Sequence, residues 1–285
     1  MTQQKQLEKE WTIMQIMYRN YFDENGTISF DLLQHLKLNL SKFDVFLMNV
    51  KEKFPKKIDK YLVTFENELD RAIKIQSDIE IEGEYPILGT YPGLLQKCKN
   101  ALLSYMNYEN YKSQRLKEKI TIKVKDFIRS DGWAVGGFFS YTAVNSLKSI
   151  MDREEALTFW KKFFDEWISS RKNSEIEVET LDEHFKNANQ LFKEIRTHNY
   201  IEIKISDGKA GDKVIKCLWP EVMRELEDKE ICDAICCYYD YQNAKNENSN
   251  FVLTRTKTLM MGNNYCDFMY HDTRLVDQVE HPDEK

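Results

Sequence analysis

The chain has 285 residues, which favours one large domain or two small ones with ample material for a core. Its formal net charge of -6 argues against nucleic acid as the main partner, because phosphate binding requires a concentrated basic face. No apolar run approaches the roughly 18 residues that cross a bilayer, and the first residues lack the apolar stretch of a signal peptide. We therefore expect a cytoplasmic protein without a membrane partner, whose six cysteines serve as thiols, metal ligands or a nucleophile rather than as structural disulfides.

The first 125 residues are predicted to form a helical N-terminal region, and they carry no catalytic motif. Apolar residues recur at helical spacing, and Ser41 is a candidate N-cap between two short helices. Residues 80–93 are rich in proline and glycine and indicate a loop. Residues 118–128 alternate as a strand does, although they could also continue the preceding helix. The expected helices span residues 4–22, 30–40, 41–53, 58–79 and 94–117.

Residues 126–275 are predicted to form an α+β domain, with a flexible acidic tail over residues 276–285. Asp152 and Glu155 form a capping box at the start of a helix. From residue 200 to 205, isoleucines alternate with polar residues and share one face of a strand. Residues 213–219 return as its hairpin partner after a turn over residues 207–212. We expect a small antiparallel sheet, packed with helices over residues 152–198 and 220–242.

Two cysteines before residue 240 lie on predicted regular elements. Cys217 and Trp219 share one face of the returning strand, so Cys217 is interpreted as a buried core thiol. A helix that begins near Asp228 carries Cys237 and Asp240 on one face, because these residues are three positions apart.

The densest set of reactive side chains lies in residues 251–271, which are predicted to form a second hairpin around a Gly-Asn turn. With a four-residue loop over residues 261–264, Cys266 shares a sheet face with Arg255 and Lys257. Asp267 and His271 then lie on the opposite face. Two cations beside a thiol favour the thiolate, which makes Cys266 the candidate nucleophile.

In this register the imidazole of a cysteine–histidine pair must come from another segment, and His198 is one candidate. A zinc site made by Cys217, Cys237, Cys266 and a histidine is the alternative, but the spacing of these residues matches no local metal motif. The expectation is a protein without a metal or another cofactor.

Several short motifs in the C-terminal part occur together. They are Arg255-Thr256-x-Thr258-Leu259, Gly262, Cys266-Asp267-Phe268-x-Tyr270, Cys217 followed by Trp219, and Cys237-x-x-Asp240. In these motifs, roughly residues 150–275 resemble the L-2-amino-thiazoline-4-carboxylic acid hydrolase family. The helical first part carries little of the resemblance.

The resemblance implies a hydrolase that opens a 2-aminothiazoline ring to give N-carbamoyl-cysteine, with a small-molecule substrate. Cys266 would attack the amidine carbon, with Asp240 or His198 as the general base. Arg255 would hold the substrate carboxylate, and Lys257, Cys237 and Tyr270 would complete the substrate site. Direct attack by water is equally compatible with the sequence. A biosynthetic enzyme with changed chemistry, a non-catalytic small-molecule-binding or regulatory module, and a homo-oligomer all remain open.

Overall fold

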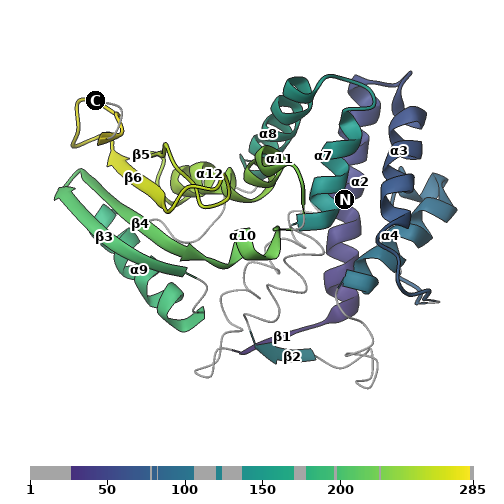
Figure 1. Ribbon diagram of the computed structural model, residues 1–285, viewed down its shortest axis with the longest axis horizontal. Coiled ribbons are helices and arrows are strands. Elements are labelled where there is room, and N and C mark those ends of the chain that lie inside the picture. The colour runs from purple at the N-terminus through teal and green to yellow at the C-terminus, as the bar shows by residue number, and fades with distance from the viewer. Residues whose placement is uncertain are drawn as a thin grey trace. The chain divides into compact units, whose positions relative to one another are not determined.

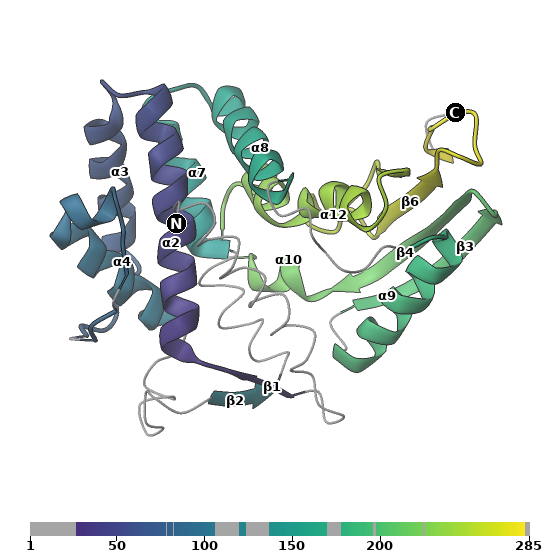
Figure 2. The same ribbon diagram turned by 180° about the vertical axis from the view of Figure 1, so that it is seen from behind.

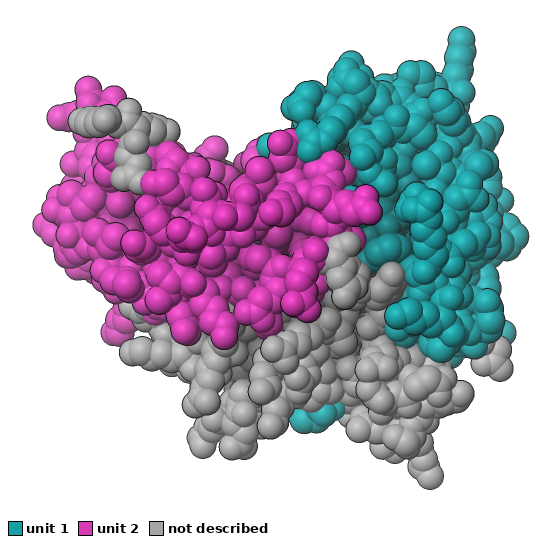
Figure 3. Space-filling model, viewed as in Figure 1, with its two compact units in different colours: residues 1–163 teal, residues 164–285 magenta. Residues whose placement is uncertain are grey.

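The computed structural model describes residues 27–77, 79–81, 83–105, 120–123, 137–169, 178–195, 198–224 and 226–282. The chain divides into two compact units, residues 1–163 and residues 164–285, which Figure 3 colours teal and magenta. The expected helix over residues 4–22 and the expected domain boundary after residue 125 lie outside the described residues.

Among its described residues, unit 1 is mainly helical and contains one two-stranded antiparallel ribbon (Figures 1 and 2). In the ribbon, Thr27 pairs with Lys123 and Phe30 pairs with Ile120, so residues 120–123 form a strand. The elements of unit 1 are β1 (Thr27–Phe30), α2 (Leu32–Lys53), α3 (Ile58–Asp70), η1 (Leu88–Thr90), α4 (Pro92–Tyr105), β2 (Ile120–Lys123), α7 (Ser140–Leu147) and the first part of α8 (Arg153–Ser169).

Helix α2 corrects the expectation of two short helices. It runs without a break through Ser41, and its N-cap is Asp31, whose Oδ1 accepts a hydrogen bond of 2.9 Å from the Gln34 backbone. The apolar side chains on both sides of Ser41 are buried, and Phe43 stacks on Phe65 with ring centroids 4.4 Å apart. Burial of one continuous apolar stripe therefore outweighs a local cap signal. Helix α3 also differs, because it ends at Asp70 rather than near residue 79.

Helix α8 confirms the predicted capping box. The Glu155 backbone donates to Asp152 Oδ1 at 2.8 Å, and the Asp152 backbone donates to Glu155 Oε2 at 3.2 Å. These two contacts satisfy N–H groups that have no partner inside the helix.

Unit 2 confirms the α+β class, with a four-stranded antiparallel sheet in the order β3-β4-β6-β5. Its strands are β3 (His198–Ser206), β4 (Lys209–Cys217), β5 (Phe251–Thr254) and β6 (Cys266–Asp272). Its helical elements after α8 are α9 (Leu181–Ile195), α10 (Leu218–Val222), α11 (Lys229–Cys232), the π-helical turn η3 (Asp233–Cys237) and α12 (Tyr239–Glu247).

One face of the sheet packs against helices α9 and α12. Ala210, Leu253 and Tyr270 from this face form a buried cluster with Phe185 of α9 and Ala244 of α12. The isoleucines of β3 point away from this cluster. Ile201, Ile203 and Ile205 are 54%, 41% and 51% exposed, so the predicted helical cover does not extend over their face of the sheet.

Both hairpins differ in register from the sequence prediction. The first turns at residues 207–208 alone, and Trp219 belongs to helix α10 instead of strand β4. In the second, β5 ends at Thr254, which pairs with Met269. Residues 255–265 then form a loop, whereas a continuous strand through Leu259 was expected.

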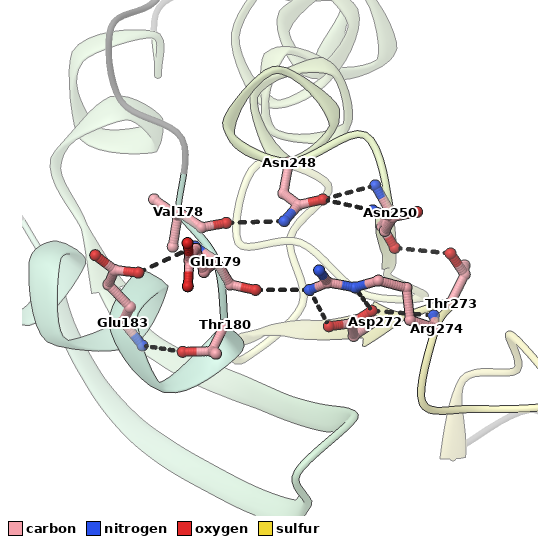
Figure 4. A network of polar contacts seen from close by, with 9 residues as sticks. All are labelled: Val178, Glu179, Thr180, Glu183, Asn248, Asn250, Asp272, Thr273 and Arg274. Atoms are coloured by element: carbon pink, nitrogen blue, oxygen red, sulfur yellow. Dashed lines mark hydrogen bonds and ion pairs between the residues drawn. The ribbon is translucent and has the colours of Figure 1, made fainter.

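A polar network joins the C-terminal end of strand β6 to the segment that precedes α9 (Figure 4). Arg274 donates to both oxygens of Asp272, at 2.9 and 2.6 Å, and its Nη2 donates to the Glu179 carbonyl at 2.6 Å. Asn248 donates to the Val178 carbonyl at 2.8 Å. Side chains thus hold together three segments that are distant in sequence, and they lower the pKa of Asp272 through its bonds to Arg274.

Candidate functional site

The candidate site lies at one end of the sheet of unit 2, where strands β3, β4 and β6 and the π-helical turn η3 bring thiols together. His198 pairs with Cys217 in the ladder between β3 and β4, and His198 Nε2 lies 3.2 Å from Cys217 Sγ. Cys237 and Cys266 both act electrostatically on Cys217 and raise its pKa, in addition to the larger effect of burial. Three elements therefore bring thiols close enough to influence one another, a group that we call the thiol cluster, with an imidazole beside Cys217.

The contact between Cys217 and His198 joins a neutral thiol to a neutral imidazole. Burial lowers the pKa of His198 to about 4, so the ring is unprotonated near neutral pH. Burial also raises the pKa of Cys217, although the Trp219 N–H opposes this change. A thiol that faces an uncharged imidazole within hydrogen-bond distance is the arrangement in which a histidine can act as a general base. The sequence offered His198 as an imidazole source, but it did not indicate Cys217 as its partner.

Cys266 corrects the expectation of a stabilised thiolate. The residue is 6% exposed, and the Leu259 backbone donates to its Sγ at 3.2 Å. Burial raises the pKa of Cys266 to about 11, and this outweighs the Leu259 hydrogen bond and the opposing charge of Arg255. The sequence pattern placed cations near the thiol but could not indicate how much solvent the thiol would lose.

Alkylation of the native protein measures this shift directly. We expect Cys266 to react with iodoacetamide at about pH 7.5 roughly 300-fold more slowly than a free thiol, because so little of it is thiolate. The rate should keep rising above about pH 10. Mass-spectrometric mapping of each cysteine gives the site-specific rate, and fast selective labelling of Cys266 near neutral pH would contradict a raised pKa.

Arg255 is buried beside the thiols and paired with Asp240. Its Nη1 donates to Asp240 Oδ2 at 2.7 Å, and its Nη2 donates to the Cys237 carbonyl at 3.1 Å. The guanidinium lies between the rings of Tyr241 and Phe268, 5.0 Å from each centroid, and the side chain is 2% exposed. Arg255 Nε is buried without a hydrogen-bond partner among the residues that the structure describes. The two hydrogen bonds use two of the five guanidinium N–H groups, and Nε is the guanidinium nitrogen that has no acceptor there.

Burial and charge act on this pair in opposite directions. Burial would lower the pKa of Arg255, but Asp240 and weaker neighbours raise it. Burial raises the pKa of Asp240 to about 6, although the charge and hydrogen bond of Arg255 oppose this change. The Asp240 side chain is 33% exposed and so keeps access to water. A carboxylate that titrates near pH 6 can exchange protons at physiological pH.

Lys257 does not join Arg255 beside Cys266. Its Nζ lies 3.2 Å from the Tyr265 hydroxyl and 4.0 Å from Asp267 Oδ2, on the side of the loop next to Asp267. The predicted alternation of side chains fails here because β5 ends at Thr254. Residue 257 therefore lies in a loop, where side chains do not alternate between two sheet faces. The expected pair of cations is therefore divided.

Asp267 organises the loop that separates the two cations. Its Oδ1 accepts hydrogen bonds from the backbones of Thr256 and Lys257, at 2.9 and 2.7 Å, and its Oδ2 accepts from the Thr256 hydroxyl at 2.5 Å. The buried His281 lies against the same residue, with Nε2 3.0 Å from the Asp267 carbonyl and 3.5 Å from Oδ2. Sequence reasoning missed both roles, and the only signal for His281 was a histidine in an otherwise acidic tail.

Tyr270 and His184 lie on the side of the sheet that packs against the helices, whereas His271 lies on the opposite face. Tyr270, an expected substrate contact, is 9% exposed and lies in the core cluster, 4.5 Å from the His184 ring. His184 forms a short contact of 2.5 Å with Glu247 of α12. His271, on the other face, hydrogen bonds Thr254 at 2.9 Å, and burial together with Lys209 and His281 lowers its pKa to about 4.

Neither a metal site nor a membrane span emerges from the part of the chain that the structure describes. Within those residues, no three or more His, Cys, Asp or Glu side chains are grouped to hold a metal ion. None of the described helices is both long and apolar enough to cross a bilayer.

Fold and site together define an α+β protein in which a thiol cluster, an imidazole and an arginine–aspartate pair meet at one end of an antiparallel sheet. Residues 137–270 match the model of the L-2-amino-thiazoline-4-carboxylic acid hydrolase family. The match confirms the resemblance over the C-terminal part, and it contains the whole thiol cluster with Arg255 and Asp240. No curated protein and no solved structure gave a match.

Proposed function

We propose that this protein is a hydrolase that opens a small heterocyclic substrate of the 2-aminothiazoline-4-carboxylate type, with a cysteine as nucleophile and no cofactor. The family match supports the reaction class. The contact of 3.2 Å between Cys217 and His198 supports the use of a cysteine, and it is the observation on which the proposal depends. A thiol of ordinary or raised pKa needs a base within hydrogen-bond reach to become a nucleophile.

We prefer Cys217 to Cys266 as the attacking thiol. Cys266 is buried beneath the Leu259 backbone, and its nearest charge partner, Arg255, is already paired with Asp240. Cys217 has the imidazole, so its proton can leave during attack rather than before it. The high pKa of Cys217 in the resting protein is then compatible with catalysis, because the thiolate forms only as the new bond forms.

In the proposed reaction, His198 takes the proton of Cys217 as the sulfur bonds to the amidine carbon of the ring. The ring carbon–sulfur bond breaks, and the imidazolium returns this proton to the departing ring sulfur. Water then adds to the same carbon while Asp240 takes one of its protons. As the adduct collapses to the carbonyl, its hydroxyl proton passes to the amidine nitrogen, the bond between the carbon and the Cys217 sulfur breaks, and this sulfur recovers a proton from Asp240. The sum is addition of one water to give N-carbamoyl-cysteine.

Arg255 is proposed to bind the substrate carboxylate through guanidinium N–H groups that the protein does not use. Nη1 and Nη2 each donate one hydrogen bond, to Asp240 and to the Cys237 carbonyl, and Nε–H has no partner among the described residues. Lys257 is one third exposed and lies on the Asp267 side of the loop, so it is proposed to act on the substrate only as a more distant positive charge. Cys237, whose carbonyl accepts from Arg255, is proposed to line the site. Recognition of a carboxylate by a buried guanidinium is strong because few competing waters are present.

The direct test is incubation with 2-aminothiazoline-4-carboxylate. We expect a new free thiol, detected with a chromogenic thiol reagent, and N-carbamoyl-cysteine, detected by mass spectrometry. The matched control is 2-aminothiazoline without the carboxylate, which should react at least about 100-fold more slowly because it cannot use Arg255. Binding of the carboxylate compound without any turnover would refute the hydrolase and favour a non-catalytic binding module, for which the deep burial of Arg255 and Cys266 is the supporting observation.

The proposed base also predicts a pH profile. We expect kcat/KM to rise with pH through about 6 and then to level off, because Asp240 must be deprotonated to activate water and its pKa is raised to about 6. His198, with its pKa lowered to about 4, is already neutral and adds no limb across roughly pH 5 to 8. Asp240→Asn should remove the limb near pH 6. A wild-type profile that is flat through this range would exclude Asp240 as the base.

A further inference from the structure

Strand β3 is an exposed edge of the sheet of unit 2. Within the described chain it pairs on one side only, with β4, and residues 201–206 are all exposed. The opposite edge is different, because β5 has only four residues and its Phe251 and Leu253 are buried. A nine-residue edge strand with exposed isoleucines is a template for pairing with another strand, and proteins normally shorten, cover or charge such an edge.

The sequence of β3 is complementary to itself in the antiparallel direction. If two copies of β3 pair about a two-fold axis at Ile203, Ile201 of one copy lies opposite Ile205 of the other. The two Ile203 side chains meet at the axis and extend the same apolar face. On the other face, Glu202 of each copy lies opposite Lys204 of the other copy. In this register, the cross-strand pairs within residues 201–205 are therefore apolar with apolar or acid with base.

We propose that unit 2 forms a two-fold symmetric dimer with a second copy of this chain through antiparallel pairing of the two β3 strands. The two four-stranded sheets would join into one continuous sheet, and their exposed isoleucines would form one strip. Because the same edge is used by both copies, the contact closes on itself and leaves no further β3 edge for growth. This inference is independent of the proposed hydrolase activity.

The present contacts of Lys204 permit this exchange of partner. Its Nζ lies 2.9 Å from Asp182 Oδ1 and 3.5 Å from Asp207 Oδ1, but these side chains are 45%, 70% and 92% exposed. Exposed ion pairs contribute little and are weakened by salt, so Lys204 can face Glu202 of a second copy at small cost. The ladder between β3 and β4 is regular from Tyr200 to Lys204, so Glu202, Ile203 and Lys204 lie on regular backbone. The pairing of Ile201 with Ile205 includes the irregularity that follows Lys204.

Charge reversal tests the pairing in solution. We expect the full chain to have twice its 34.0 kDa mass by light scattering after size-exclusion chromatography. Lys204→Glu sets acid against acid in the proposed register and Glu202→Lys sets base against base, so each variant should be monomeric at concentrations where the wild type is dimeric. The double variant Glu202→Lys with Lys204→Glu restores both pairs and should restore the dimer. A monomeric wild type, or single variants that remain fully dimeric, would overturn the proposal.

Cross-linking tests the register. Ile203→Cys brings two thiols together at the two-fold axis, within the separation that a disulfide spans, and mild oxidation should give a covalent dimer on a non-reducing gel. The matched control is Ile215→Cys, because Ile215 is similarly exposed at 48% but lies on β4, away from the edge. Cross-linking of the control to the same extent, or particles larger than a dimer, would show a different contact and refute this one.

Discussion

Replacing Cys217 with alanine is expected to lower kcat/KM for ring opening by at least about 1,000-fold, with the fold retained. The loss is large because the sulfur forms the bond to the amidine carbon and is the atom that lies 3.2 Å from His198 Nε2. Cys266→Ser is expected to lower kcat/KM by less than about 10-fold, since this side chain supports the loop from beneath and does not meet a base. Thiol release from 2-aminothiazoline-4-carboxylate measures both values.

The controls separate a lost nucleophile from a disturbed structure. Cys98→Ser changes a buried thiol in unit 1 and should leave turnover intact, provided that the variant folds. His198→Gln keeps a polar side chain of similar reach but removes the base, and it should show about the same loss as Cys217→Ala because the two act as one unit. If Cys266→Ser is the inactive variant and Cys217→Ala retains full activity, the nucleophile is the thiol that the sequence pattern favoured.

Asp267→Ala is expected to destabilise unit 2 by about 3 kcal/mol. The carboxylate is 8% exposed and accepts three hydrogen bonds from Thr256 and Lys257. Its removal deletes three hydrogen bonds at once, and hydrogen bonds to a charged acceptor contribute more than those between neutral groups. Urea unfolding gives the free energy, and hydrogen exchange at residues 256 and 257 should show the loop opening before the rest of the sheet.

Two further variants define the cause of this effect. Asp267→Asn retains an acceptor oxygen for the loop and should cost about half as much. His281→Ala should cost only about 1 kcal/mol, because the bonds from Asp267 to the loop remain when the contact at the Asp267 carbonyl is lost. If Asp267→Ala leaves exchange at residues 256 and 257 unchanged, the carboxylate does not hold the loop.

Local sequence signals were reliable where local contacts satisfy the backbone. The Asp152 and Glu155 capping box needs only residues within one helical turn, and the structure contains it as predicted. Ser41 presents a comparable local signal, but α2 continues through it because the buried stripe on both sides must stay in one helix. A local capping signal decides where a helix ends only when continuing the helix would bury no further apolar side chains.

The second hairpin shows how one long-range contact changes a register. Alternation predicted a strand to Leu259, whereas Asp267 takes the N–H groups of Thr256 and Lys257 and ends β5 at Thr254. The actual pairing is displaced by two residues from the expected one, so residue parity within the paired strands is preserved. Cys266 and Asp267 lie on opposite faces because they are consecutive residues of β6, whereas Lys257 left the paired region and moved away from Cys266.

By itself, the sequence determined the α+β class, the helical first part, the family motifs and the residue types of the candidate site. These depend on periodicity and on chemical identity, both of which are local. The tertiary structure decided that His198 meets Cys217, because that contact follows from the register of β3 on β4. It also decided that Cys266 is a buried thiol rather than a thiolate, because burial depends on every segment packed around the sulfur and outweighs the one nearby charge that the sequence revealed.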